Sequence, residues 1–124
     1  MAFDGSLTTL DAASNTVPVT ISNSKIEATD ALIKSTFTIN ADGTTIQSKS
    51  GYYIGQTSDA NGLKSSTSTS YTNALSLTDS GEFTAVSGGA YLRYNSASDQ
   101  TRFRYFKSSS YTGQKAIQLY KLAN

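Results

Sequence analysis

The sequence predicts an all-β fold, and three observations support this prediction. Ser and Thr together number 37 of the 124 residues, charged residues make up only 15%, and Pro occurs once. This composition disfavours long helices and is typical of short strands joined by polar turns. The other two observations are an internal repeat and an alternation of apolar and polar residues with a period of two. We therefore expect one all-β domain over residues 1–124.

The internal repeat aligns residues 37–58 with residues 75–96 without a gap, at an offset of 38 (75 minus 37). Apolar positions and turn glycines recur together, as they do in a duplicated strand-turn-strand unit. The identical pairs are Gly43 and Gly81, Gly51 and Gly89, Tyr53 and Tyr91, and Ser58 and Ser96.

A partial third copy occurs near the end of the chain, where Ile117 and Leu119 repeat the alternation that opens the other copies. Three units of about 40 residues, the last shared between the termini, predict a compact barrel of β-trefoil type. A β-sandwich is the alternative, because duplicated hairpins also build sandwiches. The repeat-like units are residues 37–74, residues 75–116, and a third shared by residues 117–124 and 1–36.

In the first part of the chain, the alternation predicts a hairpin from residues 17–21 and 24–28, with Pro18 near a strand start or an edge. Two short stretches have helical character, residues 11–15 and residues 28–35. Both are too short to change the fold class.

Within the repeats, Phe37 and Ile39 alternate with Thr residues, as a half-buried strand requires. Asp42-Gly43, Asn61-Gly62 and Ser80-Gly81 supply the positive φ angles of tight turns between strands. The long polar stretch 56–73 is expected to be a loop.

The segment after the second copy mixes basic and aromatic residues. As a strand, it places Arg102, Arg104 and Phe106 on one face and Phe103, Tyr105 and Lys107 on the other. We expect Phe103 and Tyr105 to enter the core and the two Arg residues to lie on a solvated face. Arg93, in a neighbouring strand, is expected to join them there.

Charge is distributed unevenly along the chain. Residues 1–92 carry four Lys and eight acidic residues, a sum of −4, whereas residues 93–124 carry six basic residues and one Asp, a sum of +5. This asymmetry makes a local anion site conceivable. The overall charge of +1 is low for a protein that binds polyanions over its whole surface.

Several kinds of chemistry are excluded or disfavoured. The chain has no His and no Cys, so the usual nucleophilic triads, Cys nucleophiles and His-based zinc sites cannot be built. Asp59 and Asn61 precede a Gly as in a calcium loop, but Ser70 stands where the closing Glu belongs, which favours a simple turn. We expect no enzyme activity, no cofactor, no metal ion and no membrane-spanning segment.

Three stretches carry a resemblance to a known family: "SGYYIGQTSDANGL", "SGGAYLRYNSASDQTRFRYFKSSS" and "QKAIQLYKL". They resemble a C-terminal accessory β-domain of secreted or surface proteins of gut Bacteroidetes, often appended to nuclease-like or other extracellular catalytic domains. The resemblance implies an exported, non-catalytic module, secreted or at the cell surface. The repeated G-x-Y-[IL] pattern is also weakly similar to ricin-type β-trefoil modules, although their Gln-x-Trp signature is missing.

We expect the module to bind carbohydrate or to attach to a surface, since aromatic faces and amides suit sugar rings and hydroxyls. One alternative is contact with an anion or nucleic acid through the Arg face, and another is a purely structural or protein-interaction domain of a larger secreted protein. Tyr53 and Tyr91 are repeat-equivalent and are expected to be structural. The candidate ligand contacts are Tyr52, Arg93, Tyr94, Asn95, Arg102 and Arg104.

Overall fold

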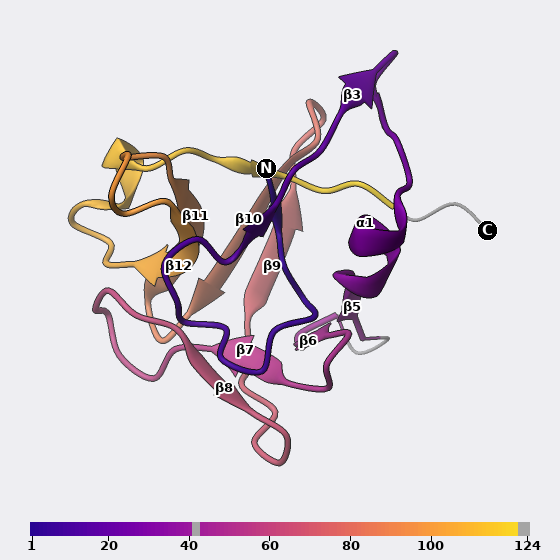
Figure 1. Cartoon of the computed structure of the whole chain (residues 1–124). Helices are drawn as coiled ribbons and strands as arrows, with labels where there is room; N and C mark the ends of the chain where they lie inside the picture. Colours follow the sequence, from indigo (N-terminus) through magenta and orange to yellow (C-terminus); the bar gives the residue numbers. More distant parts are fainter. Residues whose placement is uncertain (41–42, 122–124) are drawn as a thin grey trace.

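The computed structural model describes residues 1–40 and 43–121, which form short antiparallel strands with little helix (Figure 1). The all-β prediction is confirmed. No sheet among these residues closes into a barrel, so the trefoil barrel stays a prediction. The first strands are β1 (Ala2–Phe3), β2 (Thr16–Val17), β3 (Ile21–Ser22) and β4 (Lys25–Ile26).

A four-stranded antiparallel meander follows, in which each strand pairs with the next. The β5–β6 hairpin pairs Ile39 with Ile46, and Gly43 in its turn has a φ of 71°, a value that favours glycine. Asp42, the other residue expected in this turn, lies outside the described residues. The strands are β5 (Phe37–Ile39), β6 (Ile46–Ser48), β7 (Tyr53–Gly55) and β8 (Lys64–Ser66).

A second meander repeats this strand order, and β13 (Ile117–Gln118) pairs with the start of its second strand. The strands are β9 (Ala74–Leu77), β10 (Glu82–Ser87), β11 (Ala90–Asn95) and β12 (Arg102–Phe106). Each of these strands corresponds to one strand of the first meander. It contains the residue that lies 38 positions after the first residue of that strand. These pairs are Phe37 and Leu75, Ile46 and Thr84, Tyr53 and Tyr91, and Lys64 and Arg102.

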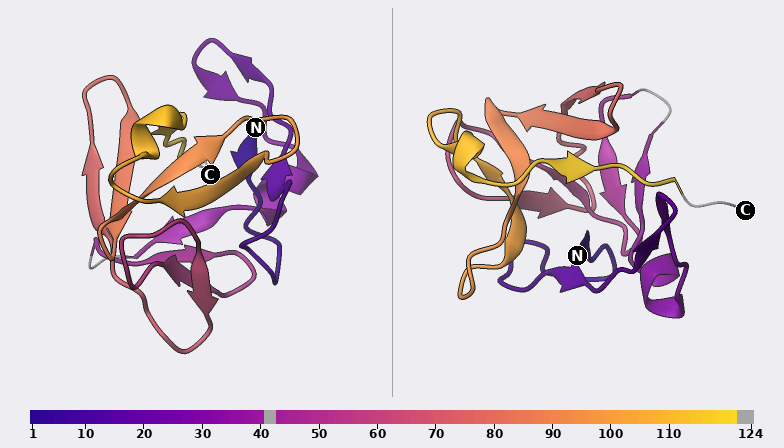
Figure 2. Two further views of the ribbon diagram at one scale, coloured as in Figure 1. Left: turned by 90° about the vertical axis from the view of Figure 1, so that its left-hand side faces the viewer. Right: turned by 90° about the horizontal axis from the view of Figure 1, so that it is seen from above.

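The first 36 residues pack beside the two meanders (Figure 2). The expected hairpin is present but shorter, because only Ile21–Ser22 and Lys25–Ile26 pair, and Val17 pairs with β1 instead. Helix α1 (Asp30–Lys34) lies within the expected helical stretch 28–35, and Thr29 caps it by accepting a hydrogen bond from the Leu32 amide at 3.3 Å.

Residues 11–15, the other stretch with helical character, form turns rather than a helix. The physical reason is Asn15, which is fully buried and bound to a distant strand: its amide accepts from the Phe103 N–H at 2.8 Å and donates to the carbonyl oxygens of Phe103 and Leu10. Neither helix among the described residues is long and apolar enough to cross a membrane.

The core lies between the meanders and the N-terminal segment. Phe3 links the three parts, since its ring centroid lies 4.5 Å from that of Phe37 and 5.1 Å from that of Phe103. As expected, Phe103 and Tyr105 of β12 are buried, and the other buried hydrophobic residues come from both meanders and from Leu10 and Val17 of the N-terminal segment. The core members are Leu10, Ile46, Ile54, Leu63, Phe83, Ala85, Ala90, Leu92 and Tyr105.

Candidate functional site

The hairpin formed by β11 and β12 brings the three Arg residues together. Arg93 lies directly opposite Arg104, and Asn95 lies directly opposite Arg102. Because residues two apart on a strand share a face, all four side chains lie on one face of the hairpin. The expectation that Arg93 joins Arg102 and Arg104 is therefore confirmed.

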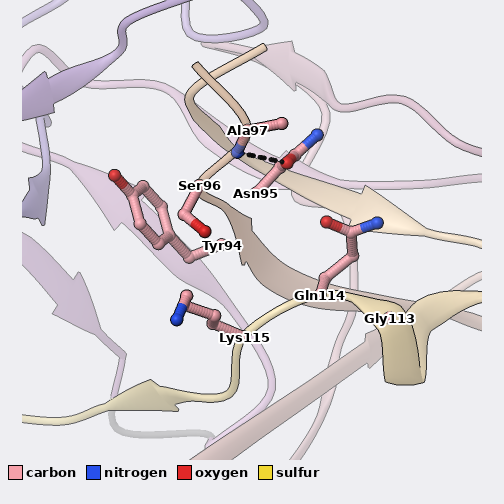
Figure 3. A pocket seen from close by; sticks show the side chains of 7 residues that line it. All are labelled: Tyr94, Asn95, Ser96, Ala97, Gly113, Gln114 and Lys115. Atoms are coloured by element: carbon pink, nitrogen blue, oxygen red, sulfur yellow. Dashed lines mark hydrogen bonds between the residues drawn. The ribbon is translucent and has the colours of Figure 1, made fainter.

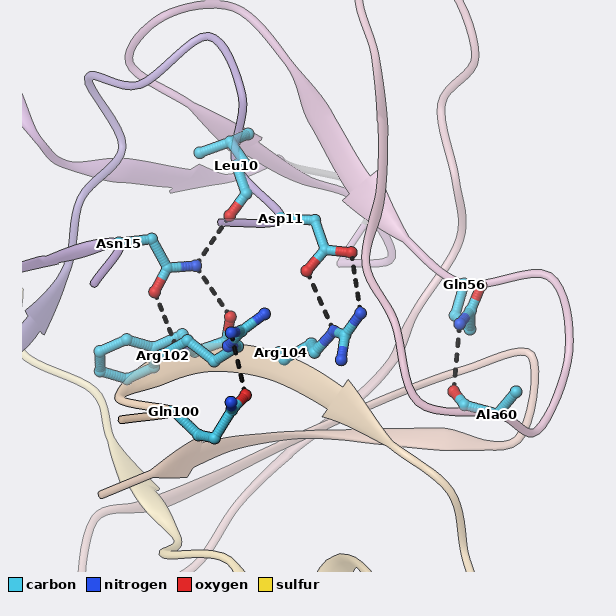
Figure 4. A network of polar contacts seen from close by, with 9 residues as sticks. Leu10, Asp11, Asn15, Gln56, Ala60, Gln100, Arg102 and Arg104 are labelled. Carbon is cyan, nitrogen blue, oxygen red and sulfur yellow. Dashed lines mark hydrogen bonds and ion pairs between the residues drawn. The ribbon is translucent and has the colours of Figure 1, made fainter. Parts of the chain in front are cut away.

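Arg104 is not a freely solvated cation, which corrects the expectation of an open Arg face. Its guanidinium forms an ion pair with the Asp11 carboxylate, with Nε 3.0 Å from Oδ1 and Nη2 donating to Oδ2 at 3.3 Å (Figure 4). Both side chains are about three-tenths exposed, at 29% each. The carboxylate neutralises this cation and reduces its attraction for an external anion.

The other two Arg residues also have partners within the chain. Arg102 donates to the side-chain oxygen of Gln100 at 3.0 Å, and Arg93 donates to the backbone oxygen of Gln114 at 3.3 Å. The Arg93 guanidinium also lies 5.0 Å from the centroid of the Tyr111 ring, which stacks on Tyr91 at 3.8 Å. These contacts hold the Arg face in place and occupy donors that an anion ligand would need.

A small pocket opens where the end of β11 meets the segment after η1 (Tyr111–Gly113) (Figure 3). Backbone hydrogen bonds between Tyr94 and Lys115, at 3.0 and 2.8 Å, hold the two segments together. The pocket has a volume of about 390 Å³, within the size range of small-molecule sites. Its lining residues are Tyr94, Asn95, Ser96, Ala97, Gly113, Gln114 and Lys115.

The polar groups of this pocket are available to a ligand. The Asn95 side-chain oxygen accepts a hydrogen bond from the Ala97 N–H at 3.0 Å, which fixes the amide and leaves its NH₂ group without a partner among the described residues. Figure 3 shows the side-chain amides of Asn95 and Gln114 near each other and the Lys115 side chain on the side of Tyr94; neither the Gln114 side-chain amide nor the Lys115 amine pairs with a described residue. The half-buried Tyr94 also lines the pocket, but its ring lies on the opposite face of β11 from Asn95, and its centroid is 4.7 Å from that of Phe103.

Of the six expected contacts, the structure brings two to this pocket, Tyr94 and Asn95. Tyr52 does not belong to it, because its half-buried ring packs against the core beside β6 and β7. Sequence reasoning missed Gln114 and Lys115, whose approach to β11 depends on the nonlocal pairing with Tyr94. The alternation of Ile117, Gln118 and Leu119, just after these residues, was the one signal of strand pairing nearby.

The loop that contains Asp59 and Asn61, for which the sequence favoured a simple turn over a calcium site, has a structural role. The Asp59 carboxylate accepts hydrogen bonds from the amide of Ser108, at 2.7 Å, and from its hydroxyl, while the Asn61 side chain accepts from the Lys107 amide at 2.9 Å. The Ser108 bonds lower the pKa of Asp59. Within residues 1–40 and 43–121, no three acidic groups gather as a metal site would require.

No protein-family model, curated protein or solved structure matches this chain significantly.

Proposed function

We propose that this protein is a non-catalytic carbohydrate-binding module and that it binds sugar in the pocket between β11 and the segment after η1. The observation that carries the proposal is a space of about 390 Å³ whose lining includes Tyr94, Asn95, Gln114 and Lys115. Amide groups hydrogen-bond to hydroxyls in both directions, and an aromatic face packs against the C–H groups of a sugar ring. The pocket combines both features.

The Arg face is the weaker alternative as an anion or nucleic-acid site. Arg104 is neutralised by Asp11, and Arg93 and Arg102 donate to oxygens of the chain itself. A polyanion would have to compete with these contacts. The pocket residues Gln114 and Lys115, in contrast, keep their polar groups available.

The proposal has two broader features, a trefoil plan and export from the cell. The strand order of the two meanders is compatible with a trefoil plan whose third unit is shared by the termini. Secretion or display at the cell surface, as an accessory to a larger protein, rests on the Ser- and Thr-rich composition and on the resemblance to accessory domains of Bacteroidetes.

The test is a titration of ¹⁵N-labelled protein with soluble polysaccharides and oligosaccharides, chosen from a glycan array. We expect the amide signals of Ala97, Gly113 and Gln114 to shift on binding. The Gln114→Ala variant should bind about threefold to tenfold more weakly, as expected for one lost hydrogen bond. Gln118→Ala is the matched control, because this exposed amide lies outside the pocket and should bind sugar as the wild type does.

Absence of any array signal together with unchanged NMR spectra would refute the proposal. Shifts confined to the amides of Arg93, Arg102 and Arg104, with affinity that falls steeply as salt rises, would favour the anion alternative instead.

A further inference from the structure

A second hollow, larger and more apolar than the sugar pocket, lies on the other side of Tyr94. It is a groove of about 1,410 Å³, bordered by the β3–β4 hairpin, α1, β5 and the segment around β13. Figure 2 shows these elements, with the β3–β4 hairpin and α1 on one side and β13 on the other. The groove is far larger than the sugar pocket and is lined by a different set of side chains.

Apolar side chains line this groove from the core to the rim, beside a smaller polar share. At its base it closes on the buried side chains of Ile54, Phe83 and Leu92. At its rim, large apolar side chains are exposed to solvent: Ile21 at 55%, Ile33 at 43%, Ile39 at 37% and Leu119 at 46%. Single apolar residues scattered over a surface are ordinary, whereas exposed apolar surface gathered around a hollow marks a binding site.

Among the described residues that line the groove, the charged side chains are those of Lys25 and Lys121, both exposed, and none is Asp or Glu. A cation at the mouth of an apolar groove favours a ligand with an anionic end and a hydrocarbon body.

We propose that this groove binds an anionic amphiphile with a long alkyl chain, such as a fatty acid. The alkyl chain packs along Phe3, Phe37 and Ile117, the half-buried residues between rim and base. The carboxylate lies at the rim, within the field of Lys25 and Lys121. The site is independent of the proposed sugar pocket, apart from Tyr94, which borders both.

The test is calorimetric titration with saturated fatty acids of ten to fourteen carbons, below their micelle concentrations. We expect affinity to rise about fourfold for each added methylene, the gain from burying a CH₂ group. The neutral alcohol of equal chain length should bind about fivefold more weakly than the acid, because it lacks the attraction to lysine. An affinity that does not depend on chain length would overturn the proposal.

Variants locate the site. Leu119→Glu should weaken binding by about tenfold or more, because it places a negative charge and removes apolar surface at the rim. The matched control is Leu77→Glu, since Leu77 is equally large and 59% exposed but lies outside the groove. Equal affinity of both variants would overturn the proposal, and circular dichroism establishes that each is folded.

Two further measurements distinguish a fatty-acid groove from binding in the sugar pocket and from a dimer interface. Gln114→Ala, which alters the sugar pocket, should bind the fatty acid with unchanged affinity, and a parallel loss would place the fatty acid in the sugar pocket and overturn the proposal. Sedimentation without ligand reports self-association. A dimer that Leu119→Glu abolishes, together with no fatty-acid binding, would overturn the proposal and assign the groove to a second copy of the chain.

Discussion

The two meanders have the same strand order but differ in what their last hairpins do. In the first, the loop between β7 and β8 is bound to the end of β12 through Asp59 and Asn61. Gln56 closes the same loop by donating to the Ala60 oxygen at 3.1 Å (Figure 4). In the second meander, residues 96 and 97 of the corresponding loop are exposed and line the pocket proposed to bind sugar. The comparison teaches that two units of the same strand order can keep similar cores while only one of them leaves this loop open beside a pocket.

The inner positions of the two copies are the most similar. Ile54 and Leu92 are separated by the repeat offset, and both are buried, at 0% and 5% exposure. The turn between β6 and β7 and the equivalent turn between β10 and β11 also agree, with φ angles of 100° at Gly51 and 93° at Gly89. A side chain is strained at such angles, so glycine recurs in both copies.

The largest expected effect tests whether the two copies form one core. Ile54→Ala and Leu92→Ala should each lower the free energy of unfolding by about 2–5 kcal/mol, through lost burial and a residual cavity. Urea denaturation followed by circular dichroism measures both. Leu77→Ala, at an exposed apolar position, is the control and should change stability by less than about 0.5 kcal/mol. A small loss at either buried position would contradict a shared core.

The second prediction concerns a position where the copies diverge. Gly55 and Arg93 are equivalent by the repeat offset, yet a Cβ at Gly55 would clash with Tyr71 and would lie 2.8 Å from the Ser87 hydroxyl. Gly55→Ala should therefore cost about 1–3 kcal/mol by overpacking. Arg93→Ala should cost about 1 kcal/mol or less, since it removes the contact with the Tyr111 ring. Thermal unfolding of both variants checks the contrast, and equal losses would contradict it.

The third prediction concerns the residues that pair with Ile54 and Leu92 on the neighbouring strands. Ser65 pairs with Ile54, whereas Tyr105 pairs with Leu92 and is fully buried. The Tyr105 hydroxyl donates to the Asn73 side-chain oxygen at 2.6 Å, and burial raises the pKa of this phenol. Tyr105→Phe should cost about 1–3 kcal/mol by leaving the Asn73 oxygen unpaired.

Ser65→Ala is the matched change in the first copy and should alter stability by less than about 0.5 kcal/mol. Urea denaturation measures both variants. If Tyr105→Phe were as stable as the wild type, the buried hydroxyl would have no part in holding the second copy together.

The sequence predicted those features that depend on neighbours along the chain. Alternation alone assigned Phe103 and Tyr105 to the core and the Arg residues to the other face of β12, and the offset of 38 located the paired strands. Phe106 departs from this pattern, because it is buried although it shares a face with Arg104. Tertiary packing over that end of the strand overrides the alternation.

Features that depend on distant pairings could not be predicted. Asp11 and Arg104 are 93 positions apart, and no local pattern connects them. The same holds for Gln114 and Lys115, which reach the proposed sugar pocket only through the bridge from Lys115 to Tyr94. Five of the seven pocket residues were therefore absent from the sequence-based set, which instead included Tyr52, a residue that packs against the core.

The smallest expected effect tests the closed loop of the first meander. The bonds from Ser108 to Asp59 stabilise the carboxylate, so its pKa in the folded protein lies below the usual value of about 3.9. Because the folded-state pKa is lowered, this stabilisation is present above about pH 3.9 and is lost as pH falls through the folded-state pKa. A carboxyl-detected NMR titration of Asp59 measures this pKa directly.

The hydroxyl of Ser108 is the largest cause of the shift, so Ser108→Ala should return the pKa of Asp59 part of the way toward its usual value. The remaining shift should come from the Ser108 amide, which the substitution leaves in place, and from Lys107. Lys107→Ala is therefore the matched variant and should move the pKa less than Ser108→Ala does. The opposite order would mean that charge rather than hydrogen bonding keeps the loop closed, and that the loop should open with added salt rather than with acid.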